Sequence, residues 1–233
     1  MKKLLSVSVA SLALASVASY TPVSIGVTEI TPAGRNTIVP APYKSLSDGG
    51  NIAVKDLVKS ENLPDGTMLY YYNGATFDAW VKGTGTWTGS DIAKKDGVTV
   101  SRGADSVKLA VGSALWVVLT GTPAENQKIY VYGAPSATAT STVASGATAL
   151  VANPCQSPAT PSFTNAAIGD TITFVSDSAT AAYSYDGAKW GAWTQTKGNF
   201  PEFSEWTPSS LAVGQGFWYK SKGVTNVTIN WQQ

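Results

Sequence analysis

The chain contains no histidine among its 233 residues, and this absence removes several classes of chemistry at once. Histidine is the commonest general base and the commonest metal ligand in proteins. Its absence excludes the Ser-His-Asp triad, the Cys-His pair and zinc sites built on imidazole. The 15 acidic residues show neither a recognisable catalytic pair nor the spacing of a calcium loop. We therefore expect a protein that is not an enzyme and that holds no metal or cofactor.

Cysteine and charge are also scarce. The single Cys155 rules out an internal disulfide framework, so it is either a buried free thiol, which we favour, or a link to another chain. Charged residues make up only 13% of the chain, and the net charge is +1. The lack of a basic excess argues against nucleic acid as a partner. The low charge leaves little repulsion to oppose association.

The N-terminal residues 1–18 have the pattern of a signal peptide. Lys2 and Lys3 form a positive start, an apolar run follows, and small residues lead to a cleavage site after Ala18. The apolar run is short and rich in serine and alanine, which does not favour a membrane span. The sequence thus predicts a secreted protein, outside the cell or at its surface. The alternative is a retained N-terminal anchor or a helix in a filament core.

Two matching motifs organise the rest of the chain. Residues 109–116 (Leu-Ala-Val-Gly-Ser-Ala-Leu-Trp) and residues 211–218 (Leu-Ala-Val-Gly-Gln-Gly-Phe-Trp) lie 102 positions apart. Small residues before a bulky pair are typical of a tight turn that leads into a strand. We therefore expect Trp116 and Trp218 to be core residues, one in each copy of a repeated unit.

A pair of hairpin segments supports this repeat. Residues 70–80 match residues 183–193 at an offset of 113, and Asn73-Gly74 corresponds to Asp186-Gly187. Asn-Gly between β-prone runs predicts a hairpin with a type I′ turn. The tyrosines of the first hairpin alternate along the strand, so one of its faces should be aromatic.

Alternating patterns and glycine-bounded strands dominate, and helical periodicity is weak outside the signal segment. We therefore predict an all-β fold of two tandem repeats, each a β-sandwich or a barrel-like body. The offset falls from 113 to 102 between the two pairs of motifs, which indicates that a charged surface excursion at residues 88–108 shortens to 201–210. The predicted organisation is unit 1 at residues 19–133, a linker at 134–148, and unit 2 at 149–233 with a final strand at 224–231.

Three β-prone segments flank the two units, at residues 23–30, 128–132 and 224–231. If the middle segment serves the junction, the outer two have no partner, and an unpaired strand edge is a template for another chain. Head-to-tail exchange of these strands would build a filament or a surface coat. In the alternative, each outer strand pairs inside its own unit. The candidate assembly residues are Val23, Ile25, Val27, Ile30, Val224, Val227, Ile229 and Trp231.

Aromatic residues are abundant, with 8 tryptophans and 10 tyrosines. Aromatic faces beside polar groups bind sugars by stacking and hydrogen bonding, as an extension of the general properties of ligand pockets. This gives a second hypothesis, a carbohydrate-binding or adhesion module that recognises surface glycans. The candidate stacking residues are Tyr70, Tyr72, Trp80, Tyr183, Tyr185 and Trp193.

Three short motifs occur together in unit 2: Asn153-Pro154, the Tyr-x-Tyr-Asp-Gly run at residues 183–187, and the Gly-x-Gly-Phe-Trp run at 214–218. In this combination the chain resembles a loose class of secreted bacterial β-repeat proteins, most of them uncharacterised. Unit 1 departs from the pattern, with Ala41-Pro42 in the first position. The resemblance implies export and surface display. Taken together, the sequence favours an exported structural protein that associates with itself, ahead of the glycan-binding module.

Overall fold

The computed structural model describes residues 25–32, 34–59, 63–89, 94–95, 98–99, 103–125, 127–136, 139–175, 180–194 and 202–233. The predicted signal peptide at residues 1–18 and the candidate residue Val23 lie outside the described residues. The predicted all-β fold is confirmed. Helix α1 (Val54–Leu57) is the only helix in the described part of the chain, and none there is long and apolar enough to cross a membrane.

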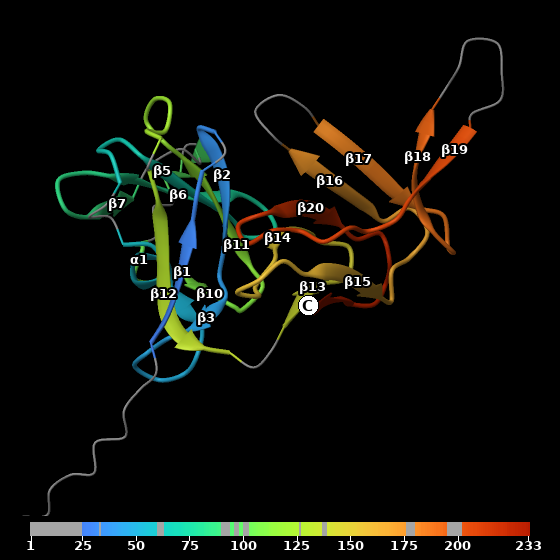
Figure 1. Ribbon diagram of the computed structural model, residues 1–233, viewed down its shortest axis with the longest axis horizontal. Coiled ribbons are helices and arrows are strands. Elements are labelled where there is room, and N and C mark those ends of the chain that lie inside the picture. The colour runs from blue at the N-terminus through green and yellow to red at the C-terminus, as the bar shows by residue number, and fades with distance from the viewer. Residues whose placement is uncertain are drawn as a thin grey trace, which may run out of the picture.

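Unit 1 is a sandwich of two antiparallel sheets, seen on the left of Figure 1. The smaller sheet has the order β1-β12-β3 and the larger has the order β2-β11-β5-β6-β7, while β10 pairs with β4 and β8 with β9. Apolar side chains from both sheets, such as Ile129 and Trp80, pack between them as one core. The strands are β1 (Gly26–Ile30), β2 (Asn36–Pro40), β3 (Tyr43–Lys44), β4 (Ile52–Ala53), β5 (Met68–Tyr72), β6 (Phe77–Lys82), β7 (Trp87–Gly89), β8 (Lys94–Lys95), β9 (Val98–Thr99), β10 (Lys108–Leu109), β11 (Ala114–Val118) and β12 (Ile129–Pro135).

Unit 2 repeats this architecture on the right of Figure 1. Its smaller sheet has the order β13-β21-β15 and its larger sheet the order β14-β20-β16-β17-β18-β19. A second, separate core lies between them, with Phe217 and Ile229 fully buried. The strands are β13 (Thr140–Val143), β14 (Thr148–Ala152), β15 (Thr160–Thr164), β16 (Thr171–Val175), β17 (Thr180–Tyr185), β18 (Trp190–Thr194), β19 (Glu202–Trp206), β20 (Gly216–Lys220) and β21 (Val227–Gln232).

The predicted linker at residues 134–148 is not a linker. It contains the end of β12 and all of β13, and β13 pairs with β21 just as β1 pairs with β12. Strand β13 is therefore the first strand of unit 2. Its sequence, Thr-Ser-Thr-Val, lies in a run of small polar residues, so the alternation that buries Ser141 and Val143 is inconspicuous.

Both terminal strands pair inside their own unit. Strand β1 is hydrogen-bonded to β12, and β21 lies between β13 and β15 with both of its edges occupied. This is the arrangement that the sequence left as the alternative, because the strand count missed β13. Of the candidate assembly residues, Ile30, Val227, Ile229 and Trp231 are buried, whereas Ile25, Val27 and Val224 are exposed.

The structure also corrects the register of the internal repeat. In the large sheets, β11 is followed by β5, β6 and β7, and β20 is followed by β16, β17 and β18. The backbone supports this equivalence. The Gly66 N–H donates to the Lys82 carbonyl, and 103 positions further along the Gly169 N–H donates to the Tyr185 carbonyl.

Residues 183–193 therefore form the β17–β18 hairpin, one strand beyond the place that residues 70–80 take in β5–β6. An offset of 102 to 103 now holds for both the hairpins and the tryptophan motifs. The predicted shortening of residues 88–108 is consequently wrong, since the offset falls by only one residue between the hairpins and the tryptophan motifs.

The two hairpin turns are nonetheless alike in detail. The N–H of Asn73 donates to the Thr76 carbonyl, and that of Asp186 donates to the Lys189 carbonyl. In each turn the side-chain Oδ1 atom of the first residue accepts hydrogen bonds from the backbone N–H groups two and three residues further along the chain. The φ angles of Gly74 and Gly187 are +97° and +106°. Since positive φ occurs only at the first of the two loop residues, the turn follows the type II′ pattern and not the predicted type I′.

The core of unit 2 contains a buried polar group that titrates. The Tyr219 hydroxyl donates to Oδ2 of Asp170 over 2.6 Å, and both residues are fully buried. Burial raises the pKa of Tyr219 above its ordinary value, and the neighbouring carboxylate raises it further. The single Cys155 is also a buried free thiol, as predicted, and burial raises its pKa.

The raised pKa of Tyr219 predicts an alkaline loss of stability. Above about pH 10 the Tyr219 hydroxyl loses its proton in the unfolded chain but keeps it in the folded protein. The free energy of unfolding therefore falls as pH rises above this value. Below that pH the contribution is fully present. Urea unfolding between pH 8 and 11 should show a shallower alkaline decline for Tyr219→Phe than for the unsubstituted protein, and equal slopes would contradict the prediction.

Candidate functional site

The two units meet where an edge strand of each large sheet approaches the other unit (Figure 1). Strand β14 lies against β2 and β11, and an isolated antiparallel bridge joins Ser113 to Val151. A small apolar cluster fills this junction. It consists of the buried Ala114, Leu150 and Ala152, with Ile38, Trp116 and Trp218 packed around them.

Trp116 and Trp218 are therefore junction residues, and the prediction that they belong to the unit cores is wrong. In β11, Leu115 and Val117 are fully buried and take the core side. Successive side chains of a strand point to opposite faces, so Trp116 points away from the core. Strand β20 repeats the pattern, and Trp218 is half-buried on its outer face. The sequence signal for this placement is the period of two along the strand, in which Leu115 and Val117 share one face and Trp116 takes the other.

The glycines of the same motifs let the units approach each other closely. Gly112 and Gly214 lie in turns with φ of +85° and +83°, a conformation that favours glycine. A Cβ atom on Gly112 would lie 2.2 Å from Oγ of Ser141, and one on Gly214 would lie 2.7 Å from Cγ2 of Ile30. The predicted tight turn is thus present, and each copy packs against the opposite unit.

An aromatic groove runs across the outer faces of the two large sheets at the junction. We define it by Tyr70, Tyr72, Phe77, Trp116 and Trp218. The Tyr72 ring lies 5.1 Å from Phe77 and 5.6 Å from Trp218 between centroids, so it connects the two units. Tyr70 lies 6.4 Å from Trp116. The predicted aromatic face of the first hairpin is therefore present. A cavity of about 240 Å³ in this groove is lined by Tyr70, Phe77, Trp116 and Val118.

The groove combines apolar ring faces with unused hydrogen-bonding groups. Within the described part of the chain, neither the hydroxyls of Tyr70 and Tyr72 nor the indole N–H groups of Trp116 and Trp218 have a protein hydrogen-bond partner. None of the residues that line the cavity is charged. Such a surface can hold a flat, neutral, amphipathic group between rings while donors at the rim fix its orientation.

The other candidate stacking residues do not join this groove. Trp80 is 0% exposed in the core of unit 1, so its assignment to a binding surface is wrong. Tyr183 and Tyr185 lie on the inner face of the large sheet of unit 2, where Tyr183 stacks on Trp206 at 4.5 Å. Trp193 is exposed on the opposite face and contacts Phe203. The displacement of the second hairpin by one strand causes this separation.

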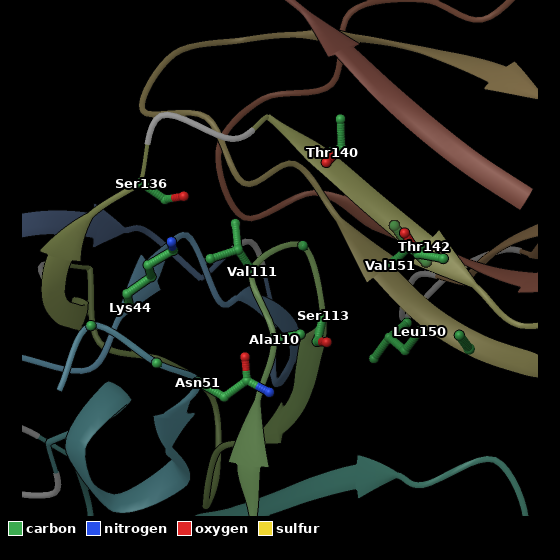
Figure 2. A pocket seen from close by; sticks show the side chains of 14 residues that line it. Lys44, Asn51, Ala110, Val111, Ser113, Ser136, Thr140, Thr142, Leu150 and Val151 are labelled. Atoms are coloured by element: carbon green, nitrogen blue, oxygen red, sulfur yellow. The ribbon is translucent and has the colours of Figure 1, made fainter.

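A second cavity, of about 390 Å³, also lies between the units and is shown in Figure 2. Its walls carry small polar side chains in place of aromatic rings. Unit 1 contributes the turn at residues 110–113 and the loop at 49–51, and unit 2 contributes parts of β13 and β14. Among the described residues no group of acidic or sulfur ligands is placed to hold a metal ion.

Comparison of the chain with protein-family models, with curated proteins and with solved structures gives no significant match. The aromatic groove and the polar cavity are therefore interpreted from their own geometry.

Proposed function

We propose that the protein is an exported, non-enzymatic module that binds neutral carbohydrate in the aromatic groove and acts in adhesion outside the cell or at its surface. The observation that carries this proposal is the cluster of five aromatic rings from both units in one groove, where Tyr70, Phe77 and Trp116 line the cavity and Tyr72 connects them to Trp218. It assigns a role to the tandem arrangement, because Trp218 of unit 2 completes a surface that unit 1 begins.

The chemistry of the groove favours sugar over other ligands. A pyranose ring presents C–H groups to an aromatic face and hydroxyls around its rim, which matches ring faces bordered by free O–H and N–H donors. The absence of charged residues in the cavity lining favours a neutral glycan over an anionic one. The groove lies on an outer sheet face, so a chain of sugars can continue beyond it.

Self-association into a filament or coat is the second candidate. Exchange of the C-terminal strand has lost its basis, because β21 would have to leave two neighbouring strands. The observation that still favours association is the exposure of two apolar side chains at the edge strand β1, Ile25 just before it by 63% and Val27 within it by 51%. Sedimentation of the mature chain over a range of concentrations tests this candidate, and a monomer throughout would contradict it.

The groove makes a direct prediction for glycan binding. On an array of neutral glycans, the mature chain should bind at least one glycan class, and Trp116→Ala should weaken that binding by about tenfold or more through lost stacking. Tyr72→Phe, which removes only a hydroxyl, should weaken it less. Isothermal titration with the best glycan gives the affinities, and thermal unfolding confirms that each variant is folded.

The matched control is Trp193→Ala, which removes an exposed tryptophan that lies outside the groove. It should leave the affinity unchanged. The proposal is wrong if no glycan on the array binds, or if Trp193→Ala lowers the affinity as much as Trp116→Ala does.

A further inference from the structure

The polar cavity in Figure 2 is bordered by the open edge of a β-strand. Strand β13 is an edge strand of its sheet, and its residues Thr140 and Thr142 line the cavity. The Trp231 N–H donates to the Ala139 carbonyl, which fixes the alternation of this antiparallel ladder. Since the residues of such a strand alternate in direction, the backbone groups of Thr140 and Thr142 point away from β21. The Thr140 carbonyl lies against Gly112, so the open part of this edge is at Thr142.

The junction is closed at the equivalent place on the other unit. The turn at residues 212–215 places Val213 against the core of unit 1 and Gly214 against Ile30. The matching turn at 110–113 leaves Val111 at the wall of the cavity instead. Both turns therefore touch an edge strand of the opposite unit, since Gly112 packs against Ser141 of β13. Beside the turn at 110–113, however, the cavity remains open.

The lining of the cavity indicates what it accepts. Its side chains include the hydroxyls of Ser113, Thr140 and Thr142, and Lys44 is its only charged residue. Among the described residues the Lys44 ammonium has no ion-pair partner, because the ion pairs there involve other lysines. A cavity of about 390 Å³ is too small for a helix or a hairpin, but it can hold a few residues of extended chain.

We propose that this cavity is a docking site for an extended acidic peptide segment, which adds to the edge of β13 and places a carboxylate near Lys44. Backbone hydrogen bonds to an edge strand supply affinity in this mode of recognition, and the pockets along the edge supply specificity. The single cation sets the direction of the peptide, because its acidic end lies at the Lys44 end of the cavity. The site is separate from the aromatic groove and does not depend on the proposed glycan binding.

The test uses two sets of labelled heptapeptides of alternating threonine and valine, one set with a terminal glutamate and one with a terminal lysine. Fluorescence anisotropy with the mature chain should show binding of the glutamate set and weaker binding of the lysine set. Thr142→Pro removes an outward-facing N–H at an edge position where proline is tolerated, and should lower affinity by about tenfold. Lys44→Glu should lower it by a similar factor.

The matched control for charge is Lys55→Glu, an exposed lysine of α1 outside the cavity, which should bind as the unsubstituted protein does. Trp116→Ala should also leave peptide affinity unchanged, which separates this site from the groove. The proposal is overturned if neither peptide set binds, if the two sets bind equally, or if Thr142→Pro has no effect. Binding of an acidic oligosaccharide without binding of either peptide set would overturn it as well.

Discussion

Replacing Trp80 by alanine is expected to lower the free energy of unfolding of unit 1 by about 3–5 kcal/mol. Trp193→Ala should lower that of unit 2 by less than about 1 kcal/mol. The two tryptophans hold the same position in the sequence repeat at an offset of 113. Their surroundings differ completely, because Trp80 is 0% exposed and Trp193 is 60% exposed.

The large effect follows from the packing of Trp80. It stands opposite Leu69 in the β5–β6 ladder and belongs to the core between the two sheets of unit 1. Truncation to alanine removes the largest fully buried side chain among the described residues and leaves a cavity that close-packed neighbours fill only in part. Trp193 loses only an edge contact with Phe203.

Urea unfolding followed by circular dichroism measures both variants, with calorimetry to assign separate transitions to the two units. Trp80→Phe is the control for side-chain volume and should recover more than half of the loss. Equal losses for Trp80→Ala and Trp193→Ala would mean that the two hairpins are structurally equivalent, contrary to the sheet order found here.

This pair of residues also shows what the sequence can and cannot predict. The turns at Asn73 and Asp186 depend on local chemistry, so both hairpins and the aromatic alternation around Tyr70 were predictable. Which strand a hairpin occupies depends on its neighbours across the sheet, and local chemistry does not contain that information. Two similar turns in successive hairpins therefore suggested an equivalence that the hydrogen bonds of Lys82 and Tyr185 contradict.

Only part of the candidate groove could be predicted from the sequence. Tyr70 and Tyr72 follow from the alternation within one hairpin, because both lie on one face of a single strand. Trp116 joins them because β11 pairs with β5 and places it opposite Tyr70, a neighbour relation that local sequence does not contain. Trp218 belongs to the groove only because β14 packs against β2 and β11, a contact between units that no pattern within either unit encodes. Strand β13 was missed for a different reason, since its small residues give a weak hydrophobic alternation.

The repeated motif acquires a structural explanation at the junction. Its glycines at 112 and 214 allow each turn to touch the opposite unit, and its tryptophans cover the outer faces beside that contact. A side chain at either glycine would separate the units and widen the groove between Tyr72 and Trp218. The same short sequence therefore links the close approach of the units to the geometry of the proposed binding surface.

Asp170→Ala is expected to destabilise unit 2 by about 3 kcal/mol. The carboxylate is fully buried and accepts three hydrogen bonds, from the Tyr219 hydroxyl at 2.6 Å, the Lys222 N–H at 2.6 Å and the Ala167 N–H at 3.0 Å. Its removal leaves the buried Tyr219 hydroxyl and two part-buried backbone N–H groups without partners. An unsatisfied buried donor costs more than the lost hydrogen bond itself. The turn before β16 and the end of β20 would lose their shared anchor.

Two comparisons separate this network from a general effect of lost charge. Tyr219→Phe removes one donor and leaves the two backbone hydrogen bonds to Asp170, so a loss of about 1 kcal/mol is expected. Glu205→Ala breaks an exposed ion pair with Lys189 in the same unit and should cost less than about 0.5 kcal/mol. Urea unfolding of the three variants at pH 7 gives the order of these losses. Unit 1 should be unaffected, because it has no equivalent carboxylate: Thr67 stands at that position and its hydroxyl donates to the Pro64 carbonyl. A loss for Asp170→Ala no larger than that for Glu205→Ala would show that the buried carboxylate does not stabilise unit 2.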